Sequence, residues 1–191
     1  SYGVKPSFLG YDGYPAALCT SVNDEIVHGV PSDRVLKDGD VLKLDMGVLH
    51  KGFHTDSAVT VLVGQLIHHN DVRRRYVDKL ISVTREALEV GIAQAKPGNT
   101  TGDIGAAIQE FVHKNGFEVV HDLVGHGIGE NLHEWPQVPN FGKWGKGDKL
   151  EVGMVIAIEP MVVTGKKRTK IGKDGFSYIT ADKGLAAHFE H

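Results

Sequence analysis

The sequence has one cysteine, little net charge and no long apolar run. Cys19 alone cannot form a disulfide within the chain or a zinc site built on several cysteines. A formal net charge of −3 over 191 residues favours neither a nucleic-acid surface nor an acidic tail. Because nothing in the sequence predicts a membrane anchor or an export leader, a soluble cytoplasmic protein is expected.

Glycine, by contrast, is abundant. It supplies 24 of the 191 residues, where about 7% is usual, and this excess favours tight turns over long helices. A chain of this length is expected to form a single domain, residues 1–191, with a buried core of its own.

The periodicity of apolar residues changes along the chain and predicts an α+β fold. Residues 8–63 predict strands and loops, with a hairpin over GDVLKLDMGVLHKGFHTDSAVTVLV. Residues 71–95 have apolar side chains near helical spacing and precede Pro97-Gly98. A second helix follows, with Thr100 or Thr101 as N-cap and Gly116 as its stop. Short strands and glycine turns are expected after it.

One strand pattern occurs twice, each time ending on an acid. VLKLD at 41–45 returns as VIAIE at 155–159, and the surrounding Leu36 and Gly39 match Leu150 and Gly153 without a gap. This register predicts two copies of one strand unit that deliver Asp and Glu to similar places. Two helices precede only the second copy, and the sequence stops inside an apolar, strand-like run, so the chain is expected to be truncated at both ends. The alternative is that something else covers half of its sheet.

The predicted hairpin makes its two aspartates neighbours. Pairing 41–48 with 53–63 around the turn places Asp45 directly opposite Asp56. Side chains opposed in this way lie about 4.5–5.5 Å apart, where two like charges are destabilising. The flanking residues are apolar, so water screens the pair poorly, and a bound cation is the natural remedy.

Three further residues complete a metal-binding set. Glu159 ends the second strand copy, His126 lies in the glycine-rich VGHGIGE, and Glu190 lies in the final AAHFEH. Four carboxylates and one imidazole suit two divalent ions such as Mn, Fe or Co, with Zn as an alternative. Two such ions activate water and polarise a carbonyl group, which is hydrolytic chemistry.

These motifs carry a resemblance to a known family. SVNDEIVHGVP, KLDMGVLHKGFHTDSAVT, LVGHGIGENLHEWPQVPNF, GMVIAIEPMV and AAHFEH together resemble the type I methionine aminopeptidases, which have the two-metal pita-bread fold. The resemblance implies that Asp45 holds one metal, that His126 and Glu159 hold the other, and that Asp56 and Glu190 bridge them. It also implies the pseudo-twofold repeat of such a fold.

The resemblance assigns further roles around the metals. It places His28 near the nitrogen of the scissile peptide bond and His133 near its carbonyl oxygen, and it gives Glu159 the proton of the attacking water. The substrate's first side chain would lie among Phe8, Tyr11, Tyr14, Cys19, Leu132 and Phe176.

Three positions depart from the family's usual residues. Phe176 stands where Trp is common, Leu132 where Phe is common, and Trp135 where an acid is usual. The other histidines are expected to be exposed or structurally satisfied: His50, His54, His68, His69, His113, His121 and His188.

The implied function is removal of the initiator methionine from nascent polypeptides whose second residue is small. A monomer is expected. The basic stretch Gly165–Gly175 is interpreted as a solvated hairpin tip, with weak contact to RNA or the ribosome as the alternative. Three other functions compete: a proline-directed aminopeptidase or dipeptidase of the same fold, a binding module without catalysis, and a thiol hydrolase using Cys19 and His28.

Overall fold

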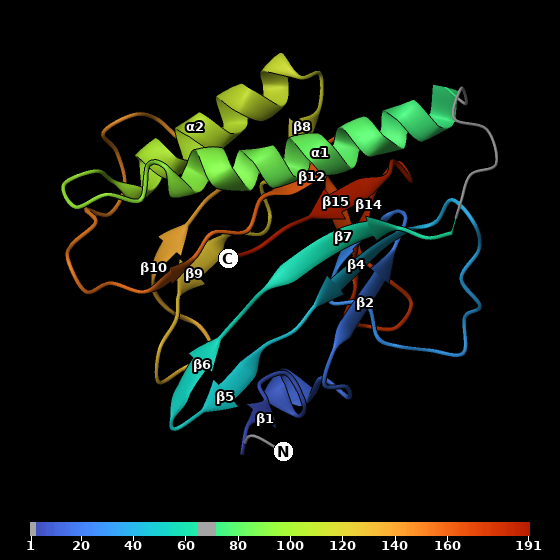
Figure 1. Cartoon of the computed structure of the whole chain (residues 1–191), viewed down its shortest axis with the longest axis horizontal. Helices are drawn as coiled ribbons and strands as arrows, with labels where there is room; N and C mark the ends of the chain where they lie inside the picture. Colours follow the sequence, from blue (N-terminus) through green and yellow to red (C-terminus); the bar gives the residue numbers. More distant parts are fainter. Residues whose placement is uncertain (1–2, 65–71) are drawn as a thin grey trace.

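The computed structural model of the chain describes residues 3–64 and 72–191 (Figure 1). Within these ranges the helices are α1 (Val72–Ile92), α2 (Thr101–Lys114) and a single 3-10 turn, η1 (Tyr11–Gly13). The strands are short: β1 (Lys5–Pro6), β2 (Cys19–Val22), β3 (Glu25–Val27), β4 (Val41–Asp45), β5 (Val48–His50), β6 (Phe53–Thr55), β7 (Ala58–Leu62), β8 (Glu118–Val119), β9 (Gly125–Gly127), β10 (Glu134–Val138), β11 (Ile156–Ala157), β12 (Met161–Val163), β13 (Thr169–Ile171), β14 (Tyr178–Thr180) and β15 (Ala186–His188).

The strands form small antiparallel sheets, which confirms the α+β class. Their orders are β1-β5-β6, β2-β4-β7, β13-β14-β3, β15-β12-β8 and β10-β9-β11. Figure 1 shows α1 and α2 side by side along one edge of the molecule, where they cover the strands of the second half. The largest apolar core lies between these helices and strands, and it includes Leu80, Ile104, Ile158 and Val162.

Helix α1 buries the face that its periodicity predicts. Val77, Leu80 and Leu88 are buried against the core, whereas Ile92 at the end of the helix is 36% exposed. The helix ends at Ile92, before the predicted residue 95, because the chain continues there only as isolated turns. The predicted first helical residue, Asp71, lies outside the described residues, as do His68 and His69.

Helix α2 begins and ends at the predicted signals. Thr100 is the N-cap, and it forms a capping box in which its side chain accepts from the Asp103 amide and the Asp103 carboxylate accepts from the Thr100 amide. The helix ends at the C-cap Asn115, followed by Gly116 with a φ of 84°. A glycine takes this left-handed conformation without the steric strain of a side chain.

The two strand copies share a turn as well as a sequence pattern. Gly39 and Gly153 have φ angles of 89° and 95°, so both copies begin with the same left-handed residue. The turn is closed by a 3.0 Å hydrogen bond from the Asp40 amide in the first copy and a 3.3 Å bond from the Met154 amide in the second. The predicted repeat is therefore present in the backbone.

The register of the hairpin differs from the prediction. Strand β4 pairs with β7 so that Asp45 lies opposite Ala58, two residues away from Asp56. Beyond β4 the hairpin continues in the same register, in which β5 pairs with β6. Because the shift is an even number of residues, Asp56 stays on the same face as Asp45 and becomes its diagonal neighbour.

The two faces of the β2-β4-β7 sheet differ in what covers them. Asp45 and Thr60 are buried on the inner face, whereas Val59 and Val61 on the outer face are 44% and 41% exposed. Leu44 pairs with Val59 on this outer face and is only partly buried, but its counterpart in the second copy, Ile158, is 3% exposed beneath the helices. The outer face is thus an apolar sheet surface.

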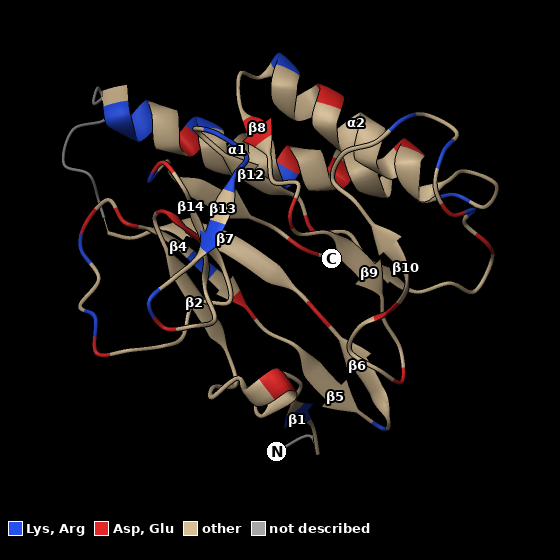
Figure 2. Ribbon diagram, turned by 180° about the vertical axis from the view of Figure 1, so that it is seen from behind, with Lys and Arg blue, Asp and Glu red and all other residues tan. Residues whose placement is uncertain are grey.

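The basic stretch at Gly165–Gly175 contains a strand and a turn. Strand β13 pairs with β14, and Gly175 closes the turn with a φ of 79° and a 3.2 Å bond to the Gly172 carbonyl. Figure 2 shows Lys and Arg residues on β13. The hairpin prediction is confirmed. Among the described residues no helix combines the length and hydropathy of a membrane span.

Candidate active site

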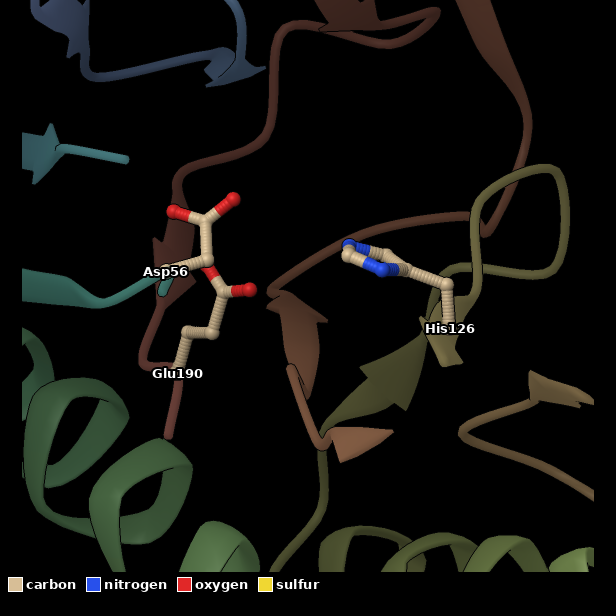
Figure 3. A group of neighbouring side chains, drawn as sticks. All are labelled: Asp56, His126 and Glu190. Atoms are coloured by element: carbon tan, nitrogen blue, oxygen red, sulfur yellow. The ribbon is translucent and has the colours of Figure 1, made fainter. Parts of the chain in front are cut away.

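Five predicted ligands converge in the centre of the molecule. Asp45 ends β4, His126 is in β9, and the other three follow strands as Asp56, Glu159 and Glu190. The ligand atoms of Asp56, His126 and Glu190 all lie within 4.8 Å of one another. Figure 3 shows the carboxylates of Asp56 and Glu190 near each other and facing the ring of His126.

The central strand β9 fixes the orientation of His126. It pairs with β10 on one side and β11 on the other, and Gly125 and Gly127 pack so closely against neighbouring backbone that a side chain would collide with it. The His126 Nδ1–H donates to the Gly127 carbonyl at 2.7 Å. This leaves the Nε2 lone pair free, 3.6 Å from Glu159 Oε1. A second hydrogen bond of this kind is typical of metal-binding histidines.

The carboxylates repel one another in a poorly hydrated place. Burial raises the pKa of Asp45, and the charge of Asp56 raises it further. Burial also raises the pKa of Asp56 to about 6, although a hydrogen bond from the Ser57 amide opposes the shift. Burial and the neighbouring carboxylates likewise raise the pKa values of Glu159 and Glu190. Without a cation, these acids therefore ionise less readily than isolated carboxyl groups do.

The donor set fits divalent metal ions. Asp45 Oδ1 and Glu190 Oε1 are buried and lack a hydrogen-bond partner among the residues that the structure describes. Buried carboxylate oxygens are rarely left in this state. Hard oxygen donors with one imidazole are the ligands that Mn, Fe, Co and Zn accept. A cation would satisfy these oxygens and relieve the repulsion together.

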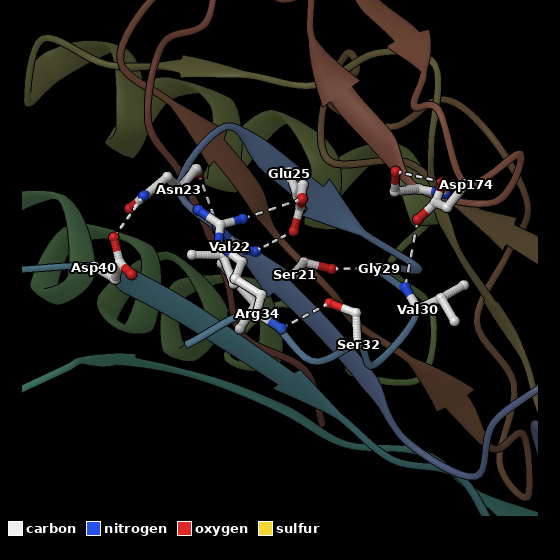
Figure 4. Close-up of polar contacts among 12 residues, drawn as sticks. Ser21, Val22, Asn23, Glu25, Gly29, Val30, Ser32, Arg34, Asp40 and Asp174 are labelled. Carbon is white, nitrogen blue, oxygen red and sulfur yellow. Dashed lines mark hydrogen bonds and ion pairs between the residues drawn. The ribbon is translucent and has the colours of Figure 1, made fainter. Parts of the chain in front are cut away.

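His28 lies beside the cluster in a strained conformation. Its φ is 60°, which is unusual for a residue with a side chain. The Gly29 amide donates to Ser21 Oγ at 2.9 Å, and the Val30 amide donates to Asp174 at 3.4 Å, as Figure 4 shows. These bonds hold the loop, and burial lowers the pKa of His28, which keeps it neutral. Strain that surrounding contacts maintain is common at functional sites.

His133 stands at the mouth of the site. Its ring meets His126 edge-on, with 4.3 Å between centroids, and its Nδ1 lies 2.7 Å from the Tyr11 hydroxyl. Burial of the ring against the pocket wall and the charges of His126 and His28 lower the pKa of His133 to about 4. The imidazole is therefore neutral at physiological pH.

The predicted pocket adjoins the metal ligands. A cavity of about 540 Å³ is lined both by the predicted ligands and histidines and by apolar side chains. All six predicted lining residues are present: Phe8, Tyr11, Tyr14, Cys19, Leu132 and Phe176. Trp135, at one of the three departures from the family pattern, also lines the cavity and is 66% exposed.

The cysteine is unsuited to nucleophilic catalysis. Burial and the charge of Asp45 raise the pKa of Cys19 to about 12. A thiol with such a pKa is not ionised at neutral pH, and the thiolate is the reactive form. This argues against the thiol hydrolase considered above.

One functional neighbour was not predicted from the sequence. His188 was expected to be exposed or satisfied, but it is 1% exposed and neither ring nitrogen has a partner within the described ranges. Its Nε2 lies 3.8 Å from Glu159 and 3.9 Å from Glu190. Burial, with the charges of His28 and Lys43, lowers its pKa to about 3. The sequence held one signal for this position: His188 lies two residues before Glu190, and residues two apart in a strand share a face.

Three of the other described histidines fit their prediction. His54 is bonded to Ser7 and His113 to Glu118, at 2.8 and 2.6 Å, while His50 is exposed. His121 is the exception. It stacks on Phe141, but its Nε2 is buried without a partner among the described residues.

The fold and this cluster together define a metal-dependent hydrolase of the pita-bread class. The chain belongs to metallopeptidase family M24, whose sequence pattern matches residues 3–191. Among similar proteins, a methionine aminopeptidase of Clostridium perfringens is 48% identical over all of this chain and 74% of its own length. Methionine aminopeptidase 1 of Bacillus subtilis is 46% identical over 99% of this chain and 73% of its own.

Solved structures agree with these relatives. A methionine aminopeptidase of Thermotoga maritima superposes with a TM-score of 0.91 at 47% identity, over 98% of this chain and 73% of that one. A prolidase of Pyrococcus horikoshii has a TM-score of 0.67 at 24% identity, over 91% of this chain and 43% of that one, which shows a shared fold alone.

Proposed function

We propose that the chain is a methionine aminopeptidase that removes the N-terminal methionine of polypeptides whose second residue is small. The convergence of four carboxylates and one histidine beside an apolar cavity of about 540 Å³ carries the proposal. Cavities of this size are typical of small-ligand sites. The similarity to proteins named methionine aminopeptidase supports the same substrate.

The proposed cofactor is a pair of divalent ions, Co, Mn, Fe or Zn. Asp45 would hold one ion, His126 and Glu159 the other, and Asp56 and Glu190 would bridge them. When bound, such ions lower the pKa of water and polarise a carbonyl group.

The protein's own residues would orient the peptide and move protons. Glu159 accepts the proton of the attacking water and passes it to the leaving amine. His28 faces the nitrogen of the scissile bond, and its neutral ring suits a hydrogen bond to that group. His133 donates to the carbonyl oxygen, where negative charge develops in the transition state.

The apolar end of the cavity would hold the methionine side chain. Phe176 meets Tyr14 edge-on at 5.5 Å between centroids, and Leu132 and Cys19 are buried beside them. Aromatic rings favour contact with a thioether sulfur. Selection between methionine and norleucine stays modest, because norleucine replaces the sulfur with a methylene, and even adding or removing a whole methylene contributes only about 1–3 kcal/mol.

The partners would be the N-termini of nascent polypeptides in the cytoplasm, with the protein acting as a monomer. Lys166, Lys167, Arg168 and Lys170 at β13 would supply weak contact with the ribosome.

A peptide assay tests the function. With Mn²⁺ present, the chain is expected to hydrolyse Met-Ala-Ser, and Glu159→Gln is expected to abolish this activity. The matched control His50→Ala alters an exposed histidine at the tip of the β5–β6 hairpin and should be fully active. Hydrolysis of Ala-Pro-Ser alone would support the proline-directed alternative. No hydrolysis together with no bound metal would support the binding module.

A further inference from the structure

Tyr11 makes a contact across the mouth of the cavity that its pocket-lining role does not require. It lies in η1, 122 positions from His133 in the chain, yet its hydroxyl is 2.7 Å from Nδ1 of that imidazole. The two rings also meet edge-on, with 5.2 Å between centroids and 67° between planes. The contact joins the two walls of the cavity.

The backbone around Tyr11 is held in an unusual conformation. Gly10 and Asp12 flank it with φ angles of 84° and 46°. The Tyr11 amide donates to the Phe8 carbonyl at 3.0 Å, and the Tyr11 carbonyl accepts from the Tyr14 amide at 2.8 Å. A left-handed Asp12 persists only where the surroundings determine it. This turn therefore fixes the direction of the Tyr11 side chain.

The Nδ1 atoms of the adjacent His126 and His133 face different hydrogen-bonding groups. A neutral imidazole has one N–H donor and one acceptor nitrogen. The partner of His126 Nδ1 is the Gly127 carbonyl, which can only accept, so the His126 proton is on Nδ1. The partner of His133 Nδ1 is a phenol, which is a good donor and a weak acceptor. Within the described ranges the Tyr11 hydroxyl has no other hydrogen bond.

We propose that Tyr11 is a positioning residue that donates to His133 Nδ1 and so keeps the proton of that imidazole on Nε2. Nε2–H is then available to donate to the carbonyl oxygen of the substrate, a step that rests on the proposed function. An exposed imidazole without such a partner exchanges between its tautomers and presents a donor only part of the time.

Tyr11→Phe removes the hydroxyl and keeps the ring. It is expected to lower kcat for Met-Ala-Ser by about 10-fold to 100-fold, by analogy with the loss of a hydrogen bond that orients a metal-binding histidine. KM should change by less than about threefold, because the interaction acts mainly in the transition state. The matched control is Tyr76→Phe on α1, whose exposed ring lies near Phe117 and far from the cavity.

A second readout does not depend on catalysis. Nitrogen-15 NMR of the zinc-loaded protein reports the tautomer of each histidine, and His133→Gln identifies the relevant signal. The wild type should show His133 protonated on Nε2, and Tyr11→Phe should show a mixture. A wild-type proton on Nδ1, or an unchanged kcat and tautomer in Tyr11→Phe, would overturn the proposal. If the wild type fails to cleave methionine peptides, the proposed function fails, and the tautomer measurement still decides the role of Tyr11.

Discussion

At the scale of single residues, we expect Asp45 to stabilise the metal-bound protein and to destabilise the metal-free one. Its carboxyl group is buried, one of its oxygens has no hydrogen-bond partner in the described part of the chain, and the charge that acts on it is that of another acid, Asp56. A bound dication would turn the repulsion between these carboxylates into attraction to the metal. The same side chain therefore has opposite effects in the two states.

Asp45→Asn is expected to separate these effects. At pH 8 with EDTA present, the variant should melt at a higher temperature than the wild type, because one repelling charge is gone. With Mn²⁺ in excess it should melt at a lower temperature, because a ligand is lost. Differential scanning calorimetry measures both shifts. Asp33→Asn, at an exposed position, serves as the control and should move neither. Shifts of the same sign in both buffers would contradict this interpretation.

Residue identities were more predictable than residue contacts. Motif order identified five candidate ligands that the structure brings together at one cavity, because each lies in a distinctive local sequence. The Tyr11–His133 bond was not predictable, since it joins positions 122 residues apart and no local pattern records it. The exact opposition of Asp45 and Asp56 was wrong because turn geometry sets the register, while their shared face was correct because alternation survives an even shift.

At the scale of elements, α2 shows how a few residues define a helix and anchor a loop. Asp103 is the acid of the capping box, and its other carboxylate oxygen accepts from the Gly145 amide at 2.6 Å. The cap thus ties the helix start to the loop that follows β10. Gly102 and Gly105 let this loop pack directly against the helix backbone.

Thr100→Ala should lower the free energy of unfolding by about 1 kcal/mol, the usual effect of losing an N-cap side chain. The reason is that the Asp103 amide loses the hydroxyl oxygen that now accepts from it. Urea denaturation followed by circular dichroism provides the measurement. Ser82→Ala, in the middle of α1, removes a hydroxyl without affecting a cap. Equal stability of Thr100→Ala and the wild type would mean that the cap is redundant.

The helices were predictable and most strands were not. Helical spacing repeats over α1 and α2, so sequence alone locates them to within a few residues. Strands such as β8 and β11 have two residues each, too few for alternation to appear. Their existence depends on partners distant in the chain, as when β9 lies between β10 and β11.

At the scale of the whole molecule, both halves of the repeat contribute acids to one centre. Asp45 and Asp56 come from the first half, and Glu159 and Glu190 from the second. We therefore expect metal binding to hold the two halves together, and we expect metal loss to weaken the entire fold.

The loss of stability on metal removal should consequently depend on pH. The folded pKa values of the four acids lie above their unfolded values, with Asp56 at about 6. In the metal-free protein, the contribution of these four acids to folding stability is most favourable below the ordinary carboxyl pKa. This contribution is lost as the pH rises through the pKa values of the folded protein. EDTA should thus lower the melting temperature more at pH 8 than at pH 5. An equal decrease in melting temperature at pH 8 and pH 5 would show that repulsion among the four acids does not cause it.

We expect the exposed outer face of the β2-β4-β7 sheet to affect how this 191-residue chain behaves at high concentration. Val59 and Val61 present apolar surface that α1 and α2 cover in the other half. Kosmotropic salts strengthen apolar association. Ammonium sulfate should therefore drive the wild-type chain into oligomers, detected by light scattering, at lower concentration than the Val59→Thr, Val61→Thr double variant. The monomer expected from the sequence stays a prediction, and a chain that remains monomeric in concentrated salt would show that this face does not self-associate.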